Sequence, residues 1–141
     1  MKKYLIFIIP LIALLISCAS KSSPRTITMD FVGSVIEDDS VAIEKYLDLD
    51  MMVDRRMEEM PPQDSAQTHQ YFRNKIMENL TDSGGTRIFW MNNRVVVNDE
   101  VIKGDTAQVE LTLLDQKKGN IYYLTVYLYK TRQGWRVFKY L

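Results

Sequence analysis

The side chain best suited to acid–base chemistry is His69, the single histidine of the chain. An unperturbed imidazole titrates near pH ~6.5, so this side chain type exchanges protons readily under physiological conditions. Its spacing from Phe72, Ile76 and Leu80 predicts one face of a helix, but no carboxylate lies at a matching helical spacing to orient the ring. We therefore interpret His69 as the rim of a packed helix, with an acid–base role as the alternative.

Metal chemistry has few candidate ligands in this chain. Asp48, Asp50 and Asp54 could supply calcium ligands, but their segment lacks the turn glycine and the closing glutamate of an EF-hand. A solvated helix end is the better interpretation of these carboxylates. One cysteine and one histidine are too few for a zinc site. Gly84-Gly85 is not followed by the Lys-Ser/Thr of a phosphate-binding loop and predicts a helix end. The sequence predicts no metal and no cofactor.

Cys18 is the only cysteine, which excludes an intrachain disulfide. Two lysines at 2–3 precede an apolar run over residues 4–16, which is too short to span a ~30 Å hydrocarbon layer and is typical of a signal peptide. Leu15-Ile16-Ser17-Cys18 resembles a bacterial lipobox, in which the cysteine is diacylated and becomes the mature N-terminus. We predict a lipoprotein signal peptide over residues 1–17. The alternative is an incidental cysteine beside an ordinary signal-peptidase site.

The residues after Cys18 bear on localisation. Ala19 stands where an aspartate favours inner-membrane retention in enterobacterial lipoproteins, so the resemblance implies the outer membrane, facing the periplasm. We predict an acylated cysteine and tether over residues 18–25, short enough to hold the domain close to the lipid surface.

Length and charge bound the remaining chain. The 141 residues are enough for one domain, which we place at residues 26–141. Basic and acidic residues balance at 18 each, and removing residues 1–17 leaves a small acidic excess. Nucleic-acid binding usually requires a basic excess or stripe, so we expect no nucleic-acid partner.

The stretch from Arg94 to Leu141 predicts three or four antiparallel strands in succession. Apolar residues alternate with polar ones, a period of two that buries one face of a sheet; they are Ala107, Val109, Leu111, Leu113, Leu124, Val126 and Leu128. Polar residues within the first strand, around Asn98, predict a bulge there.

Turn residues predict the pairing of these strands. A hairpin turn at Lys118-Gly119 would place Leu113 opposite Leu124 and Leu111 opposite Val126. In the next hairpin, closed at Gln133-Gly134, we favour a four-residue loop that puts Trp135 on the apolar face. A glycine bulge that puts Trp135 on the other face is the alternative.

Helical patterns upstream supply a cover for the apolar face. An apolar stripe from Ile27 to Ile36 predicts one helix, and a second short helix follows Asp39 or Ser40. The segment 49–60 is ambiguous. Asp64 or Ser65 is the predicted cap of a further helix that carries Phe72. Residues 87–91 look like a strand.

Helices followed by strands indicate an α+β fold, with N-terminal helices packed on one face of a curved antiparallel sheet of three to five strands. This order, with Lys103 to Val109 and Gln133 to Val137 as its turn-flanked runs, resembles bacterial lipoproteins of the nuclear transport factor 2-like superfamily. The resemblance covers residues 26–141 and implies a cystatin-like cone. It implies no catalytic residue, although the superfamily also includes isomerase-like and cyclase-like enzymes.

The outer face of the predicted sheet carries an aromatic patch, which we predict to be an interface for a second copy or an envelope protein. If Trp135 faces the helices, the patch comprises Leu114, Tyr123, Tyr127, Tyr129, Phe138 and Tyr140. The alternative is that these tyrosines only shield the backbone of the sheet.

Two functions are compatible with these features. The first is a non-catalytic, membrane-anchored envelope lipoprotein that binds a partner protein or a small apolar ligand. The second is a small enzyme of the isomerase or cyclase type with His69 as acid–base and a pocket formed with Phe72, Trp90 and Trp135. We favour the first, because no sequence motif identifies a reaction.

Overall fold

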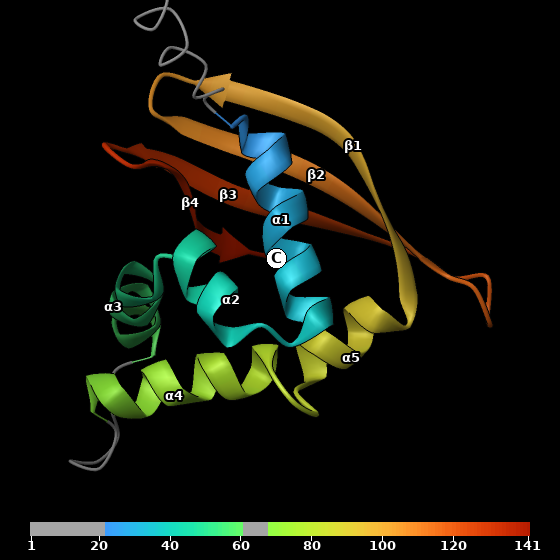
Figure 1. Cartoon of the computed structure of the whole chain (residues 1–141), viewed down its shortest axis with the longest axis horizontal. Helices are drawn as coiled ribbons and strands as arrows, with labels where there is room; N and C mark the ends of the chain where they lie inside the picture. The colour runs from blue at the N-terminus through green and yellow to red at the C-terminus, as the bar shows by residue number, and fades with distance from the viewer. Residues whose placement is uncertain (1–21, 61–67) are drawn as a thin grey trace, which may run out of the picture.

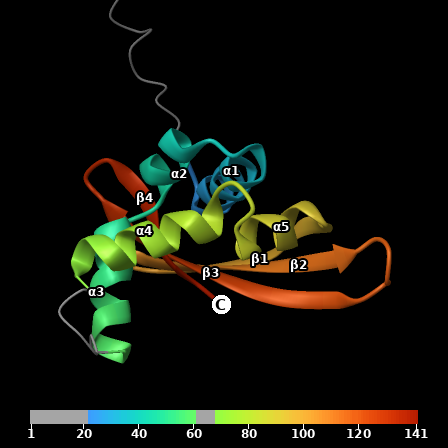
Figure 2. The ribbon, with the colours of Figure 1, turned by 90° about the horizontal axis from the view of Figure 1, so that it is seen from below.

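The computed structural model describes residues 22–60 and 68–141, which form a curved antiparallel sheet with helices packed on one face and one helix that passes the sheet edge toward the other face (Figures 1 and 2). The helices are α1 (Pro24–Glu37), α2 (Ser40–Tyr46), α3 (Leu49–Glu59), α4 (His69–Leu80) and α5 (Gly85–Met91). The strands are β1 (Asn93–Lys103), β2 (Thr106–Asp115), β3 (Ile121–Thr131) and β4 (Gly134–Tyr140). The four strands pair in chain order as a meander, which confirms the α+β prediction.

Side-chain caps explain where several helices begin. The Ser23 hydroxyl accepts from the Thr26 amide at the start of α1, and Asp39 caps α2 in the same way. Asp48 caps α3, the segment that the sequence left ambiguous. The described part of α4 begins at His69, with Thr68 as its cap. The predicted caps Asp64 and Ser65 lie outside the described residues.

The core lies between the helices and the concave face of the sheet. Phe31 and Trp90 pack edge to face with ring centroids 5.6 Å apart and fill its centre. The fully buried side chains come from every helix and from the alternating positions of β2, β3 and β4; the largest are Trp90, Phe31, Ile43, Leu47, Leu80, Leu111, Leu113 and Leu128. Within the described residues, this interior is packed with side chains.

The pairing of β2 with β3 corrects the predicted register by two residues. Leu111 pairs with Leu124, and Leu113 pairs with Tyr122. The loop is longer than the predicted turn, because the Asp115 carboxylate accepts the Lys117 and Lys118 amides at 2.9 and 3.0 Å. A shift of two residues leaves every side chain on its predicted face, so the predicted faces are right although the pairs are wrong.

A bulge in β4 overturns one of the predicted side-chain orientations. Val137 pairs with Leu128 and Lys139 pairs with Tyr127, so Phe138 is an extra residue between them. Trp135, opposite Lys130, is on the helix-facing side as predicted. Beyond the bulge the alternation is reversed, and Tyr140 turns into the core instead of onto the outer face. The predicted bulge in β1 is confirmed, between Val97 and Asp99.

Residues 87–91 belong to helix α5, so the expected strand there is wrong. Arg87 donates to the carbonyls of Val35 and Ile36 at 3.1 Å each, which ties α5 to the end of α1. Trp90 fills the core from the same helix. These tertiary contacts outweigh the strand propensity of the short apolar run.

The predicted signal peptide and the first half of the predicted 18–25 tether, including Cys18, lie outside the described residues. Pro24 and Arg25, which we assigned to the tether, belong to α1. Among the helices that the structure describes, none has the length and apolar character needed to cross a membrane.

Candidate functional site

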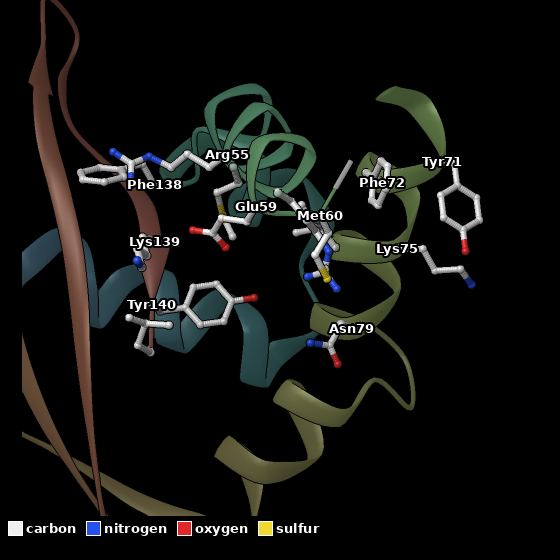
Figure 3. Close-up of a pocket in the computed structure, with 14 residues that line it drawn as sticks. Arg55, Glu59, Met60, Tyr71, Phe72, Lys75, Asn79, Phe138, Lys139 and Tyr140 are labelled. Atoms are coloured by element: carbon white, nitrogen blue, oxygen red, sulfur yellow. The ribbon is translucent and has the colours of Figure 1, made fainter. Parts of the chain in front are cut away.

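A groove of about 640 Å³ opens between α3, α4 and the end of β4 (Figure 3). Its apolar lining includes Met52, Met60, Phe72 and Ile76. Its charged lining is Arg55, Arg56, Glu59, Lys75 and Lys139. A volume of this size falls within the range of small-molecule sites, roughly 300–1,000 Å³, and the mixed lining suits a ligand that has both apolar and anionic parts.

Several groove cations are held in place by neighbours. The Arg55 guanidinium lies 4.7 Å from the centre of the Phe138 ring, a cation–π contact that joins α3 to β4. Lys75 pairs with Glu78 one turn along α4 at 2.7 Å. The Arg56 and Lys139 side chains form no ion pair among the described residues. Cations therefore outnumber Glu59 at this surface. The Lys139 ammonium lies 5.9 Å from the centre of the Tyr127 ring, and Arg56 has no ion-pair partner within the described part of the chain.

Tyr140 forms the inner wall of the groove. Its ring packs against Phe31 and Trp90 with centroids 6.0 and 5.7 Å apart. Figure 3 shows its hydroxyl directed into the space between β4 and the helices. Burial raises the pKa of Tyr140 to about 12, so the phenol remains protonated at neutral pH. It can therefore donate a hydrogen bond to an acidic group of a ligand.

His69 does not line this groove. Its Nε2 lies 3.5 Å from an Asp54 oxygen on α3, and the two side chains are 45% and 68% exposed. An acid partner thus comes from another helix, which corrects the inference from spacing within α4. The pair lies in solvent at the surface, where it links α3 to α4.

The four predicted pocket residues do not share one cavity. Phe72 lines the groove, Trp90 is buried in the core, and His69 is on the surface. Trp135 lines a different pocket, beside the start of α1. The predicted pocket was wrong because the helical cover fills the centre of the cone and leaves openings at its margins.

The aspartates considered for calcium each have another partner. Asp48 caps α3 and accepts a hydrogen bond from the Tyr129 hydroxyl. Asp50 pairs with Arg73 at 2.6 Å, and Asp54 faces His69. Among the residues that the structure describes, no group of three or more His, Cys, Asp or Glu side chains is placed to hold a metal.

The outer face of the sheet retains most of the predicted aromatic patch. Phe138 contacts Tyr127 and Tyr129, with centroids 6.4 and 5.8 Å apart. Tyr123 is the most exposed residue of the patch, at 71%. Leu114 is half-buried and lies on β2, which is separated from β4 by β3. Tyr140 leaves the patch and Arg55 covers part of Phe138, so the accessible patch is smaller than predicted.

Sequence analysis missed the cations of the groove. Arg55, Arg56 and Lys139 are ordinary exposed charges in the sequence, and no local pattern marks them. The four methionines between residues 51 and 60 were a partial signal, because methionine side chains can form adaptable binding surfaces as well as fill a core. Met52 and Met60 do line the groove.

Comparison with known proteins supports a fold but does not assign the chain to a family. No family model matches the chain. No curated protein matches it either. Among solved structures it is similar to a Campylobacter jejuni protein provisionally named an NTF2-like transpeptidase, with a TM-score of 0.54 and 16% identity. The match covers 82% of this chain and 97% of that one. It supports the cone-shaped NTF2-like fold and carries no further property across.

Proposed function

We propose that this chain is a lipid-anchored envelope protein, held at the outer membrane through Cys18, whose domain binds a small amphipathic ligand with an acidic group. The observation that carries the proposal is the groove between α3, α4 and β4, which combines methionine and aromatic walls with more cations than carboxylates among its described lining residues. Methionines adapt to irregular apolar shapes. Arg56, Lys139 and the Tyr140 hydroxyl would receive the acidic end.

The orientation of the groove agrees with an anchored role. Ser22, the first described residue, is only four positions after Cys18. Figure 1 shows the start of α1 on the side of the domain opposite α4, which forms one wall of the groove. An acylated Cys18 would therefore leave the groove directed away from the lipid surface and open to ligands in the periplasm.

Binding is a better proposal than acyl transfer, which the name of the Campylobacter jejuni protein raises. Transpeptidation by covalent catalysis requires a nucleophile activated by a base. Among the described residues that line the groove there is no Ser, Thr, Cys or His. His69, which pairs with the Asp54 carboxylate, lies outside it.

The groove is tested by filling it. Met60 and Met91 are 52% and 51% exposed, and only Met60 lines the groove. Met60→Trp should weaken binding of anilinonaphthalene sulfonate, an aromatic probe with an acidic group, by about tenfold or more, while Met91→Trp leaves it unchanged. Arg56→Gln should weaken the same probe without changing the stability of the fold. Equal effects of the two tryptophan variants would place the binding site elsewhere.

Anchoring is tested at Cys18. Mass spectrometry of the mature protein from its own envelope should show a diacylated N-terminal cysteine. Cys18→Ala should leave the precursor unprocessed or release the domain into the aqueous fraction. A wild-type mature protein with an unmodified N-terminus would refute the anchor and leave the groove proposal standing on its own test.

A further inference from the structure

A second pocket, of about 550 Å³, lies where the described chain begins. It is formed by the start of α1, the end of α2 and the β3–β4 hairpin, and its lining includes Ser22 itself. Figure 1 shows the start of α1 and this hairpin on the side of the domain opposite α4. The pocket and the groove proposed for ligand binding therefore lie at opposite ends of β4, since Gly134 to Arg136 line the pocket and Phe138 to Leu141 line the groove.

The pocket carries strong positive charge. Its lining contains Lys45, Lys130, Arg132 and Arg136, and among the described lining residues Asp30 is the single carboxylate. Lys45, Lys130 and Arg132 are exposed. This concentration of cations is local, because the whole chain has a formal net charge of +0.

Two aromatic rings stand among these cations. Trp135 is half-buried, with the Lys130 ammonium 6.0 Å from its ring, and Tyr46 has the Lys45 ammonium 5.1 Å from its ring. Tryptophan and tyrosine favour the water–lipid boundary because the ring is apolar and its polar atom can remain hydrated. The pocket therefore contains cations beside aromatic rings, a combination found at membrane interfaces.

The length of chain before Ser22 restricts where this pocket can be. Four residue steps join Cys18 to Ser22, and a fully extended chain spans at most about 3.6 Å per residue, or about 14 Å in all. If Cys18 is acylated, Ser22 lies within that distance of the lipid surface. A pocket that includes Ser22 must then stand close to the headgroups.

We propose that this pocket, with the β3–β4 hairpin, is a membrane-docking surface that binds the anionic phospholipid headgroups of the membrane in which Cys18 is anchored. The acyl chains hold the protein at the surface, and the pocket orients the domain on it. This inference rests on the proposed lipid anchor. It adds that the protein prefers anionic lipids and that the domain has a fixed orientation on the membrane. Polybasic segments beside an anchor act in this way, since each Lys or Arg near an anionic surface strengthens attachment by about fivefold.

The pocket cations differ in how freely they can be changed. Arg136 donates to the carbonyls of Glu44 and Leu47 at 2.8 Å each, so its replacement would also disturb the end of α2. The side chains of Lys130 and Arg132 have no hydrogen bond or ion pair among the described residues. Reversing the charge of Arg132 therefore removes no hydrogen bond or ion pair within the described chain, and reversing that of Lys130 removes only its contact with the Trp135 ring.

The test uses the acylated protein, reconstituted into vesicles of phosphatidylcholine alone or with about one third phosphatidylglycerol, both containing brominated lipid that quenches tryptophan on contact. Trp90 is 1% exposed, so quenching reports on Trp135, and Trp135→Phe supplies the Trp90 background. We expect strong quenching in the anionic vesicles and little in the neutral ones. Lys130→Glu with Arg132→Glu should lower the ratio of docked to undocked protein by about 25-fold or more, fivefold for each cation lost and further through the added negative charge, and abolish the quenching.

The matched control is Lys117→Glu with Lys118→Glu in the β2–β3 hairpin, which changes the net charge equally and lies at the far end of the sheet (Figures 1 and 2). It should quench like the wild type. Equal quenching in neutral and anionic vesicles, or equal effects of the two double variants, would overturn the proposal. If mass spectrometry shows no acyl chain, the anchor fails separately. The unacylated chain must then still prefer anionic vesicles in a salt-sensitive manner, and equal partition into both vesicle types overturns the docking surface as well.

Discussion

The hydroxyl of Tyr129, on the outer face of the sheet, donates a hydrogen bond to the carboxylate of Asp48 at the start of α3. The same carboxylate accepts the Met51 amide at 2.9 Å, and the Asp48 amide donates to the Val137 carbonyl at 2.7 Å. Residue 48 therefore joins a helix start, the edge strand β4 and the outer face of the sheet. This junction determines the position of α3, one wall of the ligand groove.

Removing this junction should cost more than removing an ordinary helix cap. We expect Asp48→Ala to lower the free energy of unfolding by about 1–3 kcal/mol, because both the cap and the bond from Tyr129 are lost. Asp39→Ala, which removes only the cap of α2, should cost about 0.5–2 kcal/mol. Urea titrations of both variants and of Tyr129→Phe measure the difference. If the free energy of unfolding lost in the double variant Asp48→Ala/Tyr129→Phe equals the sum of the losses in the two single variants, the hydrogen bond between the two side chains contributes nothing.

Alkaline pH should destabilise the fold through two tyrosines. Burial, and then the hydrogen bond to Asp48, raises the pKa of Tyr129 from 10.0 to about 12. Burial likewise raises the pKa of Tyr140 to about 12. The folded state thus holds these protons more tightly than the unfolded state, so the stabilisation is complete below pH about 10 and is lost as the pH rises to about 12.

Urea midpoints measured across this range should fall in the wild type and fall less in Tyr129→Phe with Tyr140→Phe. Tyr123→Phe is the control, because this tyrosine is 71% exposed. Tyrosinate absorbance, followed as the pH is raised, should show two tyrosines that ionise near pH 12. A double phenylalanine variant with the same alkaline loss as the wild type would assign the pH dependence to other groups.

Helix α4 should depend on its buried face. Phe72 and Ile76 are 7% and 5% exposed, and we expect each alanine substitution to cost about 2–5 kcal/mol. His69→Ala removes only an exposed pairing with Asp54, a kind of interaction worth about 0.2–1 kcal/mol when charged. Denaturant titration compares the three variants. If His69→Ala proved the most damaging, the orientation of α4 would be wrong.

The outer face of the sheet should support self-association. Tyr123, Tyr127, Tyr129, Phe138 and Leu114 share this face, although Arg55 covers part of it. We expect the unacylated fragment Ser20–Leu141 to increase in mass with concentration in light scattering, and Tyr127→Glu with Phe138→Glu to prevent the increase. Lys117→Glu with Lys118→Glu controls for added negative charge. A fragment that stays monomeric throughout would leave only a foreign partner for this face.

The faces of the sheet could be predicted from the sequence because alternation depends only on neighbouring residues. The predicted apolar positions of β2 and β3 are buried except for the half-buried Leu124, and Trp135 takes the expected side. The buried face of α4 could be predicted for the same reason, since a period near 3.6 is also local. The fold class followed from the order of these patterns along the chain.

The orientation of Tyr140 and the groove were decided by tertiary structure, and the register of β2 and β3 by the conformation of the loop between them. The bonds of Asp115 to the amides of its loop set the register of β2 and β3, and one extra residue at Phe138 turned Tyr140 into the core. The groove joins α3 to residues about 80 positions later in the chain, Phe138 to Leu141. Periodicity shows which face a residue occupies, but the pairing of distant segments depends on loop geometry and on which surfaces pack together, and no local pattern encodes these.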